Sequence, residues 1–103
     1  MAAASALRGE ASLMVNGRAH KLRPTFAALV AAEEELGPLF ALVERAGEGR
    51  LHLTEMAALF WHCLEDAGEC SRDDVGESVV AAGLAKVSAP LRVLLGQILK
   101  GPE

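Results

Sequence analysis

The segment from Leu53 to Ala67, LTEMAALFWHCLEDA, is apolar on almost every side and constrains the fold more than any other part of the chain. Its main apolar stripe recurs at helical spacing and consists of Met56, Ala57, Phe60, Cys63 and Leu64. Leu59 and Trp61 lie off that stripe and are apolar too. A helix at a protein surface would show a polar back. We therefore predict a central helix here, with the other elements packed around it.

The dipeptide Asn16-Gly17 predicts a β-hairpin over residues 10–23. Asn-Gly favours a two-residue type I′ turn because both positions need positive φ. The resulting register pairs Val15 with Arg18, Met14 with Ala19, Leu13 with His20, Ser12 with Lys21, Ala11 with Leu22, and Glu10 with Arg23. One face carries Ala11, Leu13, Val15 and Leu22. Because a lone hairpin is marginal in water, we expect this face to pack on the helices.

Helix start and stop signals divide the rest of the chain. Thr25 is a predicted N-cap for a helix that ends at Gly37, and a second helix runs from Pro38 to about Ala46. Ser71 and Asp74 resemble a capping box that opens a helix over 72–82, with Val75, Val79 and Val80 inward. The final segment, 84–100, is predicted to be divided by Pro90, with Ser88 as a cap.

These signals together predict an α+β, mostly helical fold, in which an N-terminal β-hairpin packs on a bundle of four to five short helices. Residues 1–9 are predicted to be a flexible leader. Residues 10–103 are predicted to form a single globular domain, with the hairpin at 10–23 and the helices within 25–100. The length of 103 residues suits one domain.

Composition excludes several classes of function. The net charge is −4 and no Lys/Arg cluster occurs, which argues against a nucleic-acid partner. No window approaches the roughly 20 apolar residues that span a bilayer, so we expect no membrane partner. Two cysteines and the lack of a signal-peptide pattern favour a reducing cytoplasm.

The sequence offers no convincing catalytic or metal-binding constellation, and we expect no enzyme activity, cofactor or metal. The histidines are His20, His52 and His62, and no two have the spacing of metal ligands. Cys63 is expected to be a small buried apolar residue, with a small enzyme using Cys63 or His62 as the alternative. His62 and Asp66 are expected to pair on the helix surface. The Glu33 to Glu35 triplet suggests a solvated helix face, or alternatively an acidic binding face.

The chain has more apolar helix surface than a domain of this size readily buries. The final helix, from Leu91 to Leu99, is the best candidate for an exposed part, because exposed apolar area marks interaction sites. It could instead close the core, or form a homodimer contact. Trp61 is expected to pack internally, with a role as a partner anchor as the alternative.

Several short elements, taken in order, carry a resemblance to a known family. They are Gly9-Glu10, Leu13, Asn16-Gly17, Leu22-Arg23, Thr25, Ala28 and Glu33 to Gly37. With these elements the chain resembles the small tail proteins of gene transfer agents and related tailed phages, which are described as gene transfer agent proteins or phage tail assembly chaperones. The likeness covers about Arg8 to Leu99. Pro24 and Pro90 depart from the family pattern and leave the course of both segments open.

The resemblance implies a non-enzymatic role in tail morphogenesis, in the cytoplasm or within an assembling phage-like particle. The implied partner is a helical, tape-measure-like tail protein or another tail subunit, and a homo-oligomer is possible. The alternative is a minor structural protein retained in the mature particle, and a free-standing regulatory module stays open. From the apolar excess we expect the partner contacts to be Trp61, Leu91, Leu94, Leu95 and Ile98.

Overall fold

The computed structural model describes residues 11–101 and shows a mostly helical α+β fold, as predicted. Its elements are β1 (Ala11–Val15), β2 (Arg18–Leu22), α1 (Phe26–Leu36), α2 (Leu39–Gly47), α3 (Leu53–Cys63), the short 3₁₀ helix η2 (Ala67–Glu69), α4 (Arg72–Ala82) and α5 (Leu84–Lys100). The predicted leader, 1–9, and the predicted pair between Glu10 and Arg23 fall outside the described residues.

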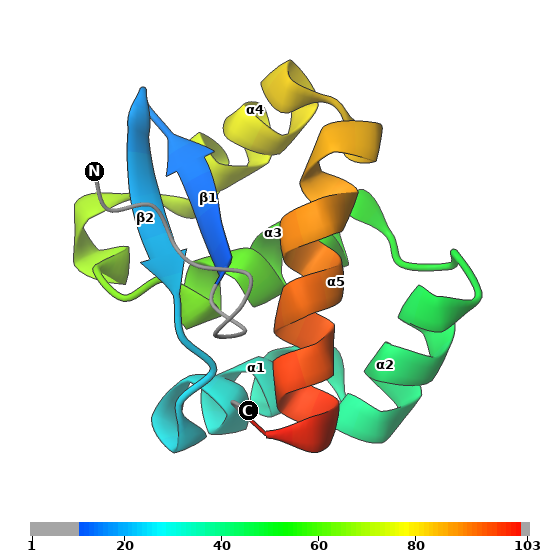
Figure 1. Cartoon of the computed structure of the whole chain (residues 1–103). Coiled ribbons are helices and arrows are strands. Elements are labelled where there is room, and N and C mark those ends of the chain that lie inside the picture. The colour runs from blue at the N-terminus through cyan, green and yellow to red at the C-terminus, as the bar shows by residue number, and fades with distance from the viewer. Residues whose placement is uncertain (1–10, 102–103) are drawn as a thin grey trace.

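The hairpin lies on one side of the helices, with α4 near its turn (Figure 1). α5 runs the length of the molecule, packs on β1, and ends near α1 and α2 at the opposite end from the hairpin turn (Figure 1). α3 packs against both α1 and α4. This arrangement brings the first two helices and the last one together, although they are distant in sequence.

The hairpin has the predicted register over all the pairs that the structure describes. Asn16 has φ 54° and Gly17 has φ 80°, as a type I′ turn requires. The predicted inner face is buried, with Val15 fully so. His20 lies on the same face and is buried too. The face therefore packs on the helices as expected.

Two glycine-to-alanine substitutions should change stability in opposite directions. Gly17→Ala should lower the free energy of unfolding by about 1 kcal/mol, because an alanine at positive φ is strained. Gly76→Ala should raise it by about 0.5–1 kcal/mol, because Gly76 is interior to α4 and an added Cβ meets open space. Urea unfolding monitored by circular dichroism measures both changes. Equal effects of the two variants would contradict the assignment of a left-handed turn.

The central helix ends four residues earlier than predicted. α3 stops at Cys63, and Leu64 adopts an extended conformation and forms a β-bridge with Leu22. The backbone N–H of Glu65 donates to Lys21 O at 2.9 Å, and that of Arg23 donates to Cys63 O. The prediction to Ala67 was wrong because these backbone groups pair with β2 and its end instead of continuing the helix.

The predicted caps of α1 and α4 are confirmed. Thr25 accepts a hydrogen bond from the N–H of Ala28 at 3.1 Å and begins α1. Ser71 Oγ accepts from the N–H of Asp74 at 3.0 Å, while Asp74 Oδ2 accepts from the N–H of Ser71 at 3.1 Å. In α4, Val75 and Val79 are fully buried, whereas Val80 is 61% exposed, so its predicted inward position was wrong. Val80 lies about 100° around the helix from Val79.

α5 is continuous, and the predicted division at Pro90 was wrong. Pro90 cannot donate a backbone hydrogen bond, which usually ends or kinks a helix. Here Val87 and Leu94, on either side of it, are both buried in the core, so packing holds the helix in one piece. Ser88 does not cap a new helix, because its hydroxyl donates to Ala85 O at 2.7 Å.

Candidate interaction surface

A groove opens on the surface where α1, α2 and the C-terminal end of α5 meet. It is lined by Leu29, Glu33, Leu39, Phe40, Val43, Ile98 and Leu99 and has a volume of about 220 Å³. An apolar cavity of about 150 Å³ is enough to hold benzene. The groove therefore has room for one aromatic or two aliphatic side chains of a partner. We call it the α1–α2–α5 groove.

Large apolar side chains around this groove are exposed to solvent. Phe40 is 82% exposed and Leu99 is 53% exposed. Phe26 is 86% exposed and lies on the α1 face that carries Leu29 and Glu33, since residues three and seven apart share a helix face. A folded domain rarely leaves phenylalanines this exposed, and a gathering of apolar side chains around a hollow marks a binding surface.

Acidic side chains border the groove. The Glu33 carboxylate accepts a hydrogen bond from the N–H of Leu39 at 3.1 Å and stays exposed. Glu44 is exposed one turn after Phe40 on the same face of α2. Residues 26–47 hold four acidic residues and one basic residue. Exposed carboxylates thus lie beside the apolar lining of the groove on α1 and α2.

The predicted contact residues on α5 differ in how far they are buried. Ile98 lines the groove. Leu91 and Leu95 are partly buried and pack against the core. Leu94 is fully buried within the core, so we correct its assignment as a partner contact. A binding role for the other four predicted residues stays a prediction.

The sequence reasoning did not name Phe26, Phe40 or Leu99 as partner contacts, although it placed Leu99 on the helix most expected to be exposed. Phe40 directly follows Leu39 in α2, and Leu42 in the same helix is fully buried. α2 buries the side that carries Leu42. Phe40 lies about 100° around the helix from Leu39, on the side away from Leu42, so a helix of nine residues leaves it exposed. In the sequence, the two consecutive apolar residues Leu39 and Phe40 could have indicated that one of them is exposed.

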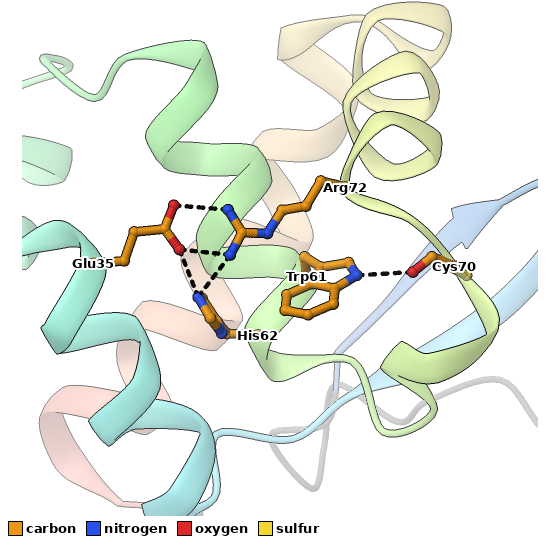
Figure 2. A network of polar contacts seen from close by, with 5 residues as sticks. All are labelled: Glu35, Trp61, His62, Cys70 and Arg72. Carbon is orange, nitrogen blue, oxygen red and sulfur yellow. Dashed lines mark hydrogen bonds and ion pairs between the residues drawn. The ribbon is translucent and has the colours of Figure 1, made fainter.

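Trp61 lies in a polar network between α1, α3 and α4, which Figure 2 shows. Its Nε1–H donates to Cys70 O at 2.8 Å, and the Arg72 guanidinium stacks 4.7 Å from its ring centroid. Trp61 is not among the residues that line the groove. These contacts make Trp61 a packing residue that holds the start of α4 in place.

Arg72 continues this network to α1. Its two terminal nitrogens donate to the Glu35 carboxylate at 2.7 and 2.6 Å. His62 Nε2 lies 2.8 Å from Glu35 Oε1 (Figure 2). The predicted surface pair of His62 with Asp66 was wrong, because the chain leaves the helix at Leu64 and Asp66 instead contacts His20. Within the Glu33 to Glu35 triplet, Glu35 thus joins three helices.

Two carboxylates have strongly lowered pKa values. The bidentate Arg72 contact, followed by the His62 contact, lowers the pKa of Glu35 to about 2. Arg45 donates to both oxygens of Glu55 at 2.8 Å and, with the His52 backbone N–H, lowers the pKa of Glu55 to about 2. Arg45 joins α2 to α3 in this way.

These ion pairs predict a loss of stability in acid. A carboxylate whose folded pKa lies below its ordinary value of 4.5 contributes stability that is present above about pH 4.5 and lost as the pH falls toward 2. After allowance for solvent screening, the pair of Glu35 with Arg72 should contribute about 1 kcal/mol. Unfolding by urea between pH 6 and 2 measures the slope. Glu35→Gln and Glu55→Gln should each flatten it, and an unchanged slope in both variants would contradict the assignment.

Cys63 is buried, as predicted, and burial raises the pKa of its thiol to about 12. At neutral pH this thiol is protonated and is a poor nucleophile. The pKa of Cys70 is also raised, first by burial and then by neighbouring carboxylates such as Asp66. Both residues serve as packing groups in the core.

Within residues 11–101, one group of side chains has ligand atoms close enough together to bind a metal ion. Ligand atoms of His20, Asp66 and Glu69 lie within 4.8 Å of one another. His20 Nδ1 is 2.9 Å from Asp66 Oδ1, and its Nε2 is 3.8 Å from Cys70 Sγ. Glu69 lies 3.5 Å from the guanidinium of Arg18. These contacts already use the ligand atoms, and they tie the hairpin to the segment after α3.

Within the described residues, no single helix is both long and apolar enough to cross a membrane. In the same part of the chain, α4 and α5 taken together reach that length and composition, across a bend of 120°.

Comparison with protein families gives a match over most of the chain. A family model described as phage tail tube protein, GTA-gp10, matches residues 8–101. Neither the curated proteins nor the solved structures contain a significant match to the chain.

Proposed function

This chain belongs to the family of phage tail tube proteins of the GTA-gp10 type, and from that premise we propose that it acts as a tail assembly chaperone for the tape-measure protein. In this role it would cover apolar helical surface of the tape measure until tube subunits polymerise around it. The family assignment makes it a protein of phage-like or gene-transfer-agent tails. The chaperone role and the tape-measure partner are the proposal.

The exposed apolar surface at the α1–α2–α5 groove is the observation that carries this proposal. Phe40 and Leu99 line a hollow with room for a partner's side chains and remain more than half exposed, and Phe26 is exposed one turn before Leu29 on α1. An amphipathic helix can lay its apolar side chains into such a groove. A long, helical tape measure presents many such segments and would aggregate if they stayed bare.

The size of the surface suits reversible binding. Burying three large apolar side chains contributes about 5–9 kcal/mol before costs. Loss of translational and rotational freedom costs at least about 4 kcal/mol. A single contact is therefore weak, and several copies along one tape measure would hold it collectively. Tube subunits could then displace the copies one at a time.

We propose no enzymatic step. The buried thiol of Cys63 has a pKa of about 12, and His62 is committed to the contact with Glu35. The side chains considered as catalytic from the sequence therefore serve the packing of α1, α3 and α4.

A second candidate is a structural subunit that stays in the finished tail. The family description, tail tube protein, favours it directly. The same apolar groove would then contact neighbouring tail subunits instead of a transient partner.

A tagged pull-down from the host during particle production separates the two candidates. The chaperone proposal predicts recovery of a very long, helical protein by mass spectrometry and absence of this chain from purified particles. Fixed stoichiometry in purified particles would support the structural subunit. Recovery of neither a tape measure nor tail subunits would overturn both.

A further inference from the structure

We propose that the α1–α2–α5 groove selects an amphipathic helix whose apolar stripe is bordered by lysine or arginine. This inference rests on the proposed function, because it defines the chemistry of the partner at the same surface. It extends the proposal from an apolar partner to one with a defined charge pattern.

The charge around the groove is the first observation. Residues 26–47 carry a net charge of −3. The basic residue in this segment, Arg45, donates both terminal nitrogens to Glu55 on α3. Among residues 11–101, no cationic side chain lies within ion-pair distance of Glu33, Glu34 or Glu44. Within the described residues these three carboxylates therefore have no cationic partner and can meet positive charge on a partner protein, while one Glu33 oxygen accepts from the N–H of Leu39.

The position of the carboxylates is the second observation. Glu33 lines the groove, with Leu29 one turn before it on α1. Glu44 follows Phe40 by one turn on α2. Acidic groups thus border the apolar lining on two of its three helices. A helix docked between them would meet apolar groups along its centre and carboxylates along its edges.

The volume of the groove limits what enters it. About 220 Å³ accepts one aromatic side chain or two aliphatic ones. Two aliphatic side chains on one helix face are spaced three or four residues apart. The partner segment should therefore carry one aromatic side chain or such an aliphatic pair, with lysine or arginine on either flank.

A second copy of this chain fits the groove poorly. A symmetric pair places the same patch of each copy face to face. Glu33 and Glu44 of one copy would then approach those of the other, and like charges across an interface are unfavourable. The exposed apolar surface alone would permit a homodimer, and the charge around it favours a basic partner.

Matched synthetic peptides test the inference on the full chain. Both are amidated helical 18-mers with the same leucine stripe, one flanked by lysine and the other by glutamate. Amide chemical shifts of the ¹⁵N-labelled protein locate the contact, and titration gives the affinity. We expect the lysine peptide to shift signals of Phe40, Ile98 and Leu99 and to bind about three- to tenfold more tightly, with the preference shrinking as salt is raised.

Charge variants show whether the named carboxylates cause the preference. Glu33→Gln with Glu44→Gln should remove most of the preference for lysine while the glutamine oxygen still accepts from Leu39 N–H. Asp73→Asn with Glu77→Gln removes the same charge from α4 and should leave the preference unchanged. Thermal unfolding of each variant confirms that it is folded.

Other outcomes overturn the inference. These are equal binding of the two peptides, shifts confined to the hairpin turn and α4, or a concentration-dependent dimer that covers the groove without peptide. Failure here is separable from failure of the chaperone role. A tape measure recovered equally by wild type and by the Glu33→Gln, Glu44→Gln variant would keep the role and remove the charge selection. Selection of the lysine peptide without recovery of a tape measure would keep the charge selection and remove the chaperone role.

Discussion

Leu94→Ala is expected to lower the free energy of unfolding by about 2–5 kcal/mol, the cost of a cavity in a packed core. Leu94 is fully buried between the other helices and the hairpin. Leu99→Ala, in the same helix, should change it by less than about 0.5 kcal/mol, because Leu99 is 53% exposed. Chemical unfolding in urea measures both variants on the same scale.

The pair of variants tests which side of α5 faces the core. They remove the same atoms from the same helix, so differences in helix propensity cancel. If Leu99→Ala proved as destabilising as Leu94→Ala, α5 would be rotated about its axis from the position described. The groove between α1, α2 and α5 would then be lost as well.

Phe40→Ser combined with Leu99→Ser is expected to weaken binding of the helical partner by about 100-fold or more. Truncating a central apolar anchor typically costs 2 kcal/mol or more, which is about 30-fold for each side chain. Both side chains are more than half exposed, so the unbound protein should lose little stability. Titration of the purified variant with the recovered partner measures the loss, and circular dichroism confirms the fold.

A matched control uses exposed apolar residues at the other end of the molecule. Met14→Ser with Val80→Ser removes side chains that are 56% and 61% exposed on β1 and α4. This control should bind the partner as well as the wild type does. Loss of binding in the control, with retention in the Phe40 and Leu99 variant, would move the binding surface to the hairpin and α4.

Local sequence determined the hairpin, the caps and most helix bounds. Asn16-Gly17 set the turn and the register because few residue pairs accept two positive φ angles. Thr25 and the reciprocal pair of Ser71 and Asp74 fixed the starts of α1 and α4, because their side chains satisfy backbone groups within three residues. Each of these signals acts between near neighbours, so the sequence alone reveals it.

The tertiary structure decided the features that depend on distant partners. Leu64 leaves the helix to pair with Leu22, and α5 continues through Pro90 because Val87 and Leu94 are buried on both sides of it. Glu35 reaches Arg72 and His62 across three helices, where the sequence indicated only a solvated triplet or an acidic binding face.

The candidate site was predicted only in part, for the same reason. Periodicity identified the apolar stripe of α5 and included Ile98, which lines the groove. It could not tell that Leu94 faces the core while Phe40 and Leu99 face solvent. Helical spacing shows which residues share a face. Which face is buried depends on the packing of α1, α2 and α5. Leu29 and Leu99, which both line the groove, are 70 positions apart in the chain.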